Sequence, residues 1–130
     1  MLRQNTFLRY ALLADAVASG ATGLMMIAGA SLLEGLLGLP TALMREAGLV
    51  LLPYVAFVAW AGTREAISRP AVQAIIAMNV LWVVGSAVVL LGFVAPTILG
   101  YAFVIAQAVV VGVFAELQFI GLRRQEAVAA

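Results

Sequence analysis

The chain has 130 residues, of which 65% are hydrophobic and only 10% are charged. Soluble domains contain roughly 45–50% apolar and about 25% charged residues, so this composition indicates a protein surrounded by lipid. The net charge is +1 and the seven basic residues, all arginine, form no basic stripe, so nothing indicates a nucleic-acid partner. The sequence contains neither cysteine nor histidine. This excludes thiol chemistry and removes the usual general base and the usual zinc and haem ligands.

Four apolar segments follow one another, each near the ~20 residues that cross about 30 Å of hydrocarbon. We expect membrane helices over about residues 7–33, 43–61, 71–93 and 97–122. The connections are short, which makes sequential helices antiparallel neighbours. The predicted fold is therefore an all-α membrane protein, with residues 1–130 forming a single antiparallel bundle of four transmembrane helices.

The beginning of the chain resembles a secretory leader, because arginines precede an apolar run and Ala16-Val17-Ala18 is typical of a signal-peptidase site. However, Asp15 lies where the apolar part of a leader should be, and the apolar run continues to about Leu37. The segment is therefore predicted to be the first membrane helix.

The placement of the arginines predicts the orientation. Six of them lie on one side of the expected bundle, and only Arg45 lies on the other. The positive-inside rule makes the arginine-rich side cytoplasmic. We therefore expect a multi-pass protein of the bacterial inner membrane with both termini in the cytoplasm. The six arginines are Arg3, Arg9, Arg64, Arg69, Arg123 and Arg124.

Polar groups inside these segments are the candidates for a site, because an ionisable side chain at a helix centre costs roughly 2.5–3.5 kcal/mol on insertion scales. Asp15 and Glu116 lie six and seven residues from the arginines that bound their helices, or about 9–10 Å deep at 1.5 Å per residue. Asn79 lies ten residues beyond the nearest arginine, about 15 Å deep. We expect these three to form one polar cluster in the cytoplasmic third of the bundle.

Helical spacing adds detail to this expectation. Asp15 shares a ridge with Ser19 and Gly23, and Glu116 shares one with two small residues, so both acids are expected to face protein. Three interpretations stay open: interhelical hydrogen bonding alone, binding of a proton, cation or amine, and contact with a partner subunit. The secondary candidates are Ser19, Trp82 and Gln107.

No catalytic constellation is present in the sequence. Serine and threonine have no histidine or lysine to activate them, and no glycine-rich phosphate loop occurs. Two carboxylates without histidine or a third acid make a weak metal site. We therefore predict a protein that is not an enzyme, with no metal and no cofactor.

The run Leu36-Leu37-Gly38-Leu39-Pro40 resembles the helix–loop junctions of DoxX-like and related four-helix bacterial membrane proteins. This resemblance implies an inner-membrane protein, in some members linked to respiratory or redox complexes, although this chain lacks the cysteines of thiol-linked redox chemistry. The chain is also similar to the small multidrug resistance transporters, whose essential carboxylate, normally Glu, lies in the first helix where Asp15 is found. The one-sided arginines argue against the dual topology known in that group.

Two functions are carried forward. One is a non-enzymatic structural or accessory component of a membrane complex. The alternative is a small proton- or cation-coupled transporter, or a small-molecule binder, that uses intramembrane carboxylates. The expected partners are the lipid bilayer and either further copies of the chain or a larger complex.

Overall fold

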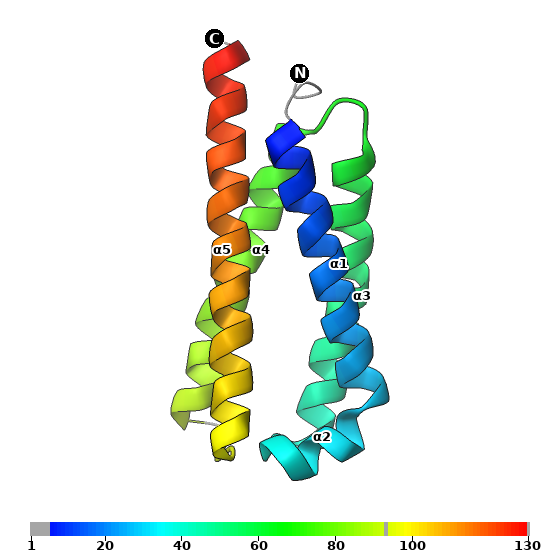
Figure 1. Ribbon diagram of the computed structural model, residues 1–130, viewed down its shortest axis with the longest axis vertical. Coiled ribbons are helices and arrows are strands. Elements are labelled where there is room, and N and C mark those ends of the chain that lie inside the picture. Colours follow the sequence, from blue (N-terminus) through cyan, green and yellow to red (C-terminus); the bar gives the residue numbers. More distant parts are fainter. Residues whose placement is uncertain (1–5, 93, 130) are drawn as a thin grey trace.

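The computed structural model describes residues 6–92 and 94–129, and for residues 125–129 it describes the backbone only. Four of the helices are long and apolar enough to cross a membrane, namely α1, α3, α4 and the part of α5 that ends at Arg124. The predicted all-α bundle of four membrane-spanning helices is thereby confirmed (Figure 1). The helices are α1 (Thr6–Ala28), α2 (Ala30–Leu37), α3 (Thr41–Thr63), α4 (Arg69–Gly92) and α5 (Ile98–Ala129).

The first predicted helix, over residues 7–33, is in fact two helices. Gly29 separates α1 from α2, although the amide of Gly29 still donates to the Met25 carbonyl at 2.8 Å. The α2 helix ends at Gly38, whose φ of 69° lies in the left-handed region that favours glycine. The predicted boundaries of the second and third segments differ by one or two residues, as helix ends usually do, but α5 continues to Ala129 and does not end near residue 122. Residue 93, the predicted end of the third segment, lies outside the described residues.

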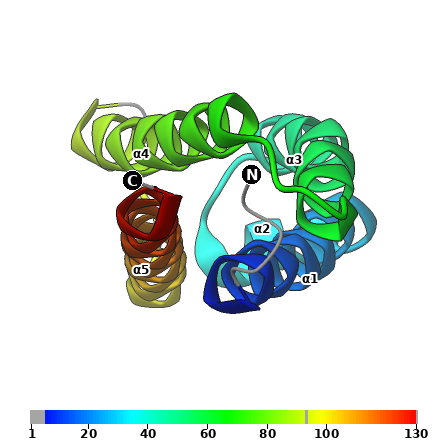
Figure 2. The same ribbon diagram turned by 90° about the horizontal axis from the view of Figure 1, so that it is seen from above.

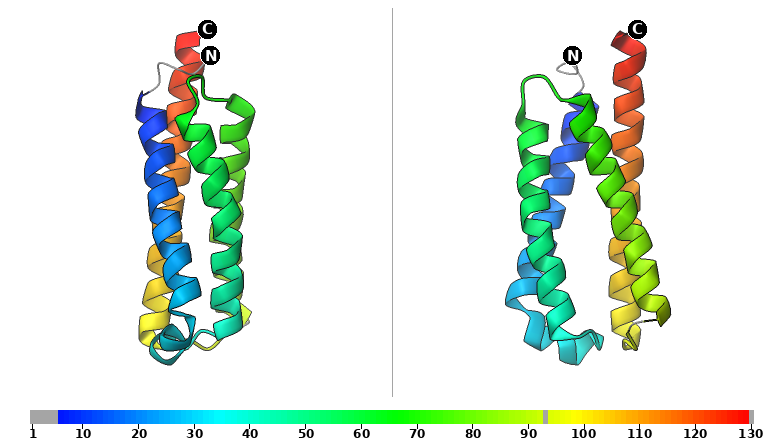
Figure 3. Two further views of the ribbon diagram at one scale, coloured as in Figure 1. Left: turned by 90° about the vertical axis from the view of Figure 1, so that its right-hand side faces the viewer. Right: turned by 180° about the vertical axis from the view of Figure 1, so that it is seen from behind.

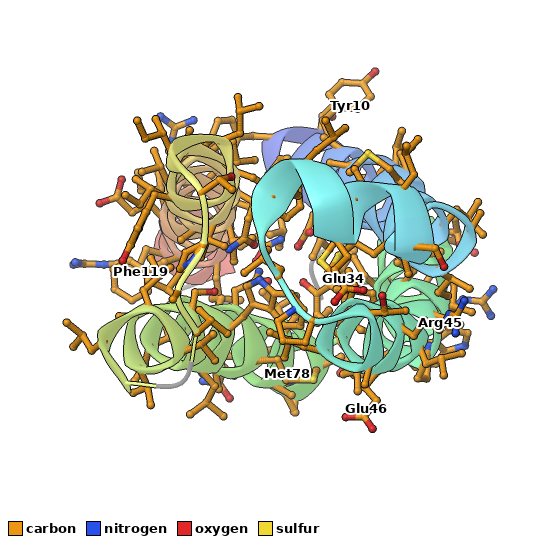
Figure 4. All side chains as sticks on the ribbon, turned by 90° about the horizontal axis from the view of Figure 1, so that it is seen from below. Tyr10, Glu34, Arg45, Glu46, Met78 and Phe119 are labelled. Atoms are coloured by element: carbon orange, nitrogen blue, oxygen red, sulfur yellow. The ribbon has the colours of Figure 1, made fainter. Side chains whose placement is uncertain are left out.

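The two ends of the described chain lie at the same end of the bundle, together with the connection between α3 and α4, and α2 lies at the opposite end (Figure 1). This arrangement follows from four antiparallel crossings. Arg9 and the arginines at the adjoining ends of α3, α4 and α5 share the first end, which we call the arginine end. Arg45 lies near the α2 end and points away from the bundle (Figure 4). Arg3 lies outside the described residues.

The four long helices form two pairs. The α1 helix packs along α3 and α4 packs along α5, whereas α3 and α4 meet only over a short stretch. Seen from above, the α4–α5 pair lies on one side and the α1–α3 pair on the other (Figure 2). From behind, α3 and α4 are close at the arginine end and diverge toward the α2 end (Figure 3). The short α2 helix contacts both α3 and α5 and so bridges the two pairs where they are furthest apart.

The buried apolar side chains form two separate clusters. One lies toward the arginine end and includes Leu8, Leu12, Val58, Val72 and Ile75. The other lies toward α2 and includes Met26, Leu37, Met44, Leu51 and Val104. Polar side chains and a cavity lie between these clusters and are described next.

Candidate functional site

The Asp15 side chain of α1 is completely buried, and its carboxylate is the centre of a hydrogen-bonded cluster. The Ser19 hydroxyl, one turn along α1, donates to Oδ1 at 2.8 Å. The Tyr54 hydroxyl of α3 and the Gln118 amide of α5 donate to Oδ2 at 2.6 Å and 2.8 Å. The Asn79 amide of α4 donates to the same oxygen at 3.1 Å. One carboxylate therefore connects all four membrane-spanning helices.

The partners of Asp15 also contact one another. The Asn79 amide donates to Gln118 Oε1 at 2.9 Å, and the Tyr54 hydroxyl lies 2.8 Å from Asn79 Oδ1. Gln118 is 0% and Asn79 3% exposed. Among the described residues, no buried side-chain nitrogen or oxygen lacks a hydrogen-bond partner. The five side chains therefore form one closed polar network, which we call the Asp15 cluster.

The hydrogen bonds of the Asp15 carboxylate come from uncharged groups. Arg9 is the nearest arginine along the chain, but its guanidinium is engaged at the end of α3. It donates to the carbonyls of Gly62 and Arg64 at 2.7 Å each, and to that of Glu65 at 3.3 Å. The Asp15 carboxylate is therefore held by neutral donors, without a cation at hydrogen-bonding distance.

Glycines bring the helices close enough for these contacts. A Cβ atom at Gly121 would lie 3.0 Å from the Cβ of Leu8, which places α5 tightly against α1 one turn from Gln118. A Cβ atom at Gly23 would lie 3.2 Å from the Cβ of Leu51 on α3. Small residues permit such approach between membrane helices. The predicted ridge that runs from Asp15 to Gly23 thus faces protein.

Asp15, Asn79 and the secondary candidate Ser19 are brought together as expected, but the expected membership of Glu116 is wrong. Glu116 is exposed on α5. Each residue turns an α-helix by about 100°, so Glu116 and Gln118 point about 160° apart, to nearly opposite faces, and cannot serve the same cluster. The small-residue ridge that Glu116 shares does not mark an interface between helices of this chain either, because a Cβ atom at Gly112 would meet nothing within 4 Å.

The other two secondary candidates, Trp82 and Gln107, form a second polar group. The Trp82 indole nitrogen donates to Gln107 Oε1 at 2.6 Å, and the Gln107 amide donates to the Ser86 hydroxyl at 3.0 Å and to the Val104 carbonyl at 2.8 Å. The Ser86 hydroxyl donates in turn to the Trp82 carbonyl at 2.8 Å. These bonds join α4 to α5 at mid-height, and we call these three side chains the Trp82 group.

A half-open cavity of about 700 Å³ lies between the two helix pairs, where α3 and α4 diverge. Its wall is mostly apolar, but both polar groups reach it: Ser19, Tyr54 and Asn79 from one, and the whole Trp82 group from the other. Met78, which also lines it, lies between α3 and α4 (Figure 4). A second hollow of about 260 Å³ on the α1–α5 side shares Ser19, Trp82 and Gln107 with the first. The two polar groups thus border a space of the size that small-molecule sites have.

Three members of these groups, Tyr54, Ser86 and Gln118, were not among the candidates from the sequence. Tyr54 lies in the middle of α3, whereas membrane tyrosines are enriched at the interfaces. Its depth was therefore a signal of a buried hydroxyl contact. Gln118 lies on a helix ridge with Ala115 and Leu122, both buried. The apolar residues on that ridge were a signal that Gln118, and not Glu116, faces the interior of the bundle.

Among the side chains that the structure describes, no group of three or more Asp, Glu, His or Cys residues is placed to hold a metal ion. The Asp15 cluster brings one carboxylate together with amides and hydroxyls, which suits hydrogen bonding rather than strong cation coordination. No protein-family model, curated protein or solved structure matches this chain. The geometry of the site is therefore the basis for proposing a function. The resemblance of the chain to DoxX-like proteins and to small multidrug resistance transporters stays an expectation.

Proposed function

We propose that this protein is a small integral membrane protein that binds a lipophilic small molecule in the cavity between α3, α4 and α5. The observation that carries the proposal is the cavity itself, about 700 Å³ in volume, with two hydrogen-bonded polar groups on an otherwise apolar wall. Small-molecule sites are typically apolar clefts of roughly 300–1,000 Å³ with a few convergent polar groups. Packing alone would favour filling such a space.

The polar groups define the occupant more narrowly than the volume does. Tyr54 and Asn79 line one part of the cavity, and Trp82 and Gln107 line another part. A molecule with an apolar body and one hydrogen-bonding head would match this wall. Phospholipid acyl chains would use only the apolar surface, so they are the alternative occupant to test against.

The cavity also favours the binding function over a purely structural or accessory role. A structural role for Asp15 needs the hydrogen bonds of its cluster but gives no reason for a large space beside them. We further propose that the arginine end faces the cytoplasm of a bacterial inner membrane, because five of the described arginines gather there and the positive-inside rule makes that side cytoplasmic. Homo-oligomers or a larger complex remain compatible with this proposal.

Substitution of a cavity glycine provides a direct test. Gly85 lines the cavity, and a Cβ atom there would meet nothing within 4 Å, so Gly85→Leu adds an apolar side chain that starts from open space on the cavity wall. Gly112 on α5 is equally open and does not line the cavity, so Gly112→Leu is the matched control. Both changes replace a helical glycine, which raises helix propensity to a similar degree.

The assay is purification of the three proteins in detergent, followed by solvent extraction and mass spectrometry of bound small molecules. We expect a lipophilic compound to accompany the wild type and Gly112→Leu and to be lost from Gly85→Leu by tenfold or more, which corresponds to about 1.4 kcal/mol of binding free energy. Recovery of phospholipid only, or equal recovery from all three, would overturn the proposal.

A further inference from the structure

The Tyr54 hydroxyl faces two acceptors but has only one hydrogen. Its oxygen lies 2.6 Å from Asp15 Oδ2 and 2.8 Å from Asn79 Oδ1. A phenol donates a single hydrogen bond, and both amide and carboxylate oxygens are acceptors. When Asp15 is ionised, one of these two oxygen–oxygen contacts therefore holds no hydrogen.

Reassignment of the amides does not supply the missing hydrogen. A rotation of the Asn79 amide by 180° would place its NH₂ group beside the Tyr54 oxygen and remove that pair of acceptors. It would also place the amide oxygen beside Asp15 Oδ2 and Gln118 Oε1, which creates two new pairs of acceptors. Turning both amides over would leave both amide oxygens facing Asp15 Oδ2. With an ionised carboxylate, every arrangement leaves at least one close contact between acceptors in a buried site.

A single added proton supplies the missing hydrogen. Placed on Asp15 Oδ2, it donates to the Tyr54 oxygen, and the Tyr54 hydrogen then donates to Asn79 Oδ1. The balance is simple: one O–H bond forms on the carboxylate, the tyrosine hydrogen changes its acceptor, and no other bond breaks. Each of the two oxygen–oxygen contacts then contains one hydrogen.

Among the described residues, no charged side chain donates a hydrogen bond to Asp15. Of the side chains that contact Asp15, only Tyr54 of α3 is titratable, since α1 contributes Ser19 and α4 and α5 contribute amides. Along the packed helices, the Arg9 guanidinium of α1 is engaged with carbonyls at the end of α3. On α5, Glu116 is exposed on a different face of the helix.

We propose that Asp15 and Tyr54 together form a proton-binding site that takes up and releases one proton beside the cavity. This inference goes beyond the binding of a lipophilic molecule and does not depend on it. Tyr54 and Asn79 line the cavity, whereas Asp15 is buried and does not line it. The Tyr54 hydroxyl therefore connects the proton on Asp15 to the cavity.

The sequence makes a test possible without mutation, because Asp15 is the only aspartate in the chain. Labelling with aspartate carrying ¹³C in its side-chain carboxyl group therefore places one reporter at the site. Carbon NMR and infrared spectra of the full chain in lipid, recorded over a range of pH, distinguish the carboxylic acid from the carboxylate. We expect a single transition with one proton released per labelled site.

Three variants complete the experiment. Tyr54→Phe removes the shared hydrogen and should move the midpoint of the transition, whereas Glu116→Gln should leave it unchanged. Gly85→Leu, with its altered cavity wall, should retain the transition, so a failure of ligand binding would not be mistaken for a failure of the proton site. A labelled carboxyl that stays ionised at every pH at which the protein is folded would overturn the proposal. A midpoint that Tyr54→Phe does not move would also overturn it.

Discussion

Gln118 and Glu116 lie two positions apart on α5, but their replacement by leucine should change the stability of the protein to very different degrees. Gln118 is completely buried and makes two interhelical hydrogen bonds, to Asp15 Oδ2 at 2.8 Å and from Asn79 at 2.9 Å. Interhelical hydrogen bonds in membranes average about 0.6 kcal/mol with a maximum near 1.7, and bonds to charged groups in proteins contribute roughly 1.5–3 kcal/mol. We therefore expect Gln118→Leu to lower the free energy of unfolding by about 1–3 kcal/mol.

Glu116→Leu is the matched control on the same helix. Glu116 is exposed, and surface substitutions away from special features usually change stability by less than about 0.5 kcal/mol. The measurement is unfolding in mixed micelles by titration with a denaturing detergent, followed by circular dichroism. Loss of stability on Glu116→Leu, or a Gln118→Leu protein as stable as the wild type, would refute the placement of α5 described here.

Three further outcomes are expected. Gly48→Ala should destabilise the protein by about 1–3 kcal/mol in the same unfolding assay, because the added Cβ would lie 2.9 Å from the Gly23 carbonyl oxygen. Gly35→Ala, where the added Cβ enters open space, should not destabilise the protein. Equal effects of the two substitutions would contradict the close approach of α1 and α3. Arg9→Ala should lower stability by about 1–3 kcal/mol and increase proteolysis of the connection at residues 64–68, because the carbonyls of Gly62 and Arg64 lose their donor; an unchanged cleavage rate would argue against this role. A reporter fused to the C-terminus should be active in its cytoplasmic form only, as the one-sided arginines imply, and activity restricted to the periplasmic form would reverse the proposed orientation.

The membrane-spanning helices could be predicted because length and apolar composition determine them almost independently of tertiary contacts. The break at Gly29 could not, because a glycine in an apolar run is tolerated within a helix as readily as it ends one. Its effect here depends on α2 reaching the start of α5, where the Thr97 amide donates to the Leu37 carbonyl at 3.0 Å. That contact joins residues far apart in sequence and has no local signal.

The candidate site was predictable in its centre but not in its membership. Asp15 and Asn79 were identified as members of the cluster by their depth in the membrane and by the free-energy cost of placing polar side chains there. The same reasoning selected Glu116 over Gln118, because it weighed charge and did not compare helix faces. Glu116 lies one turn from Ile120, which is exposed, whereas Gln118 lies one turn from the buried Leu122. The cavity could not be predicted, since it results from the divergence of α3 and α4.

The distribution of the Asp15 partners along the chain has a consequence for the synthesis and folding of the protein. Ser19 is available four residues after Asp15, but Tyr54, Asn79 and Gln118 follow 39, 64 and 103 residues later. At a synthesis rate of about 5–20 residues per second, the last partner emerges roughly 5–20 s after the carboxylate. Until those residues are made, the hydrogen bonds of the Asp15 carboxylate to α3, α4 and α5 cannot form. An incomplete chain therefore differs from a complete one in that Asp15 lacks hydrogen-bond partners from the later helices. Membrane-bound quality-control proteases could recognise this difference.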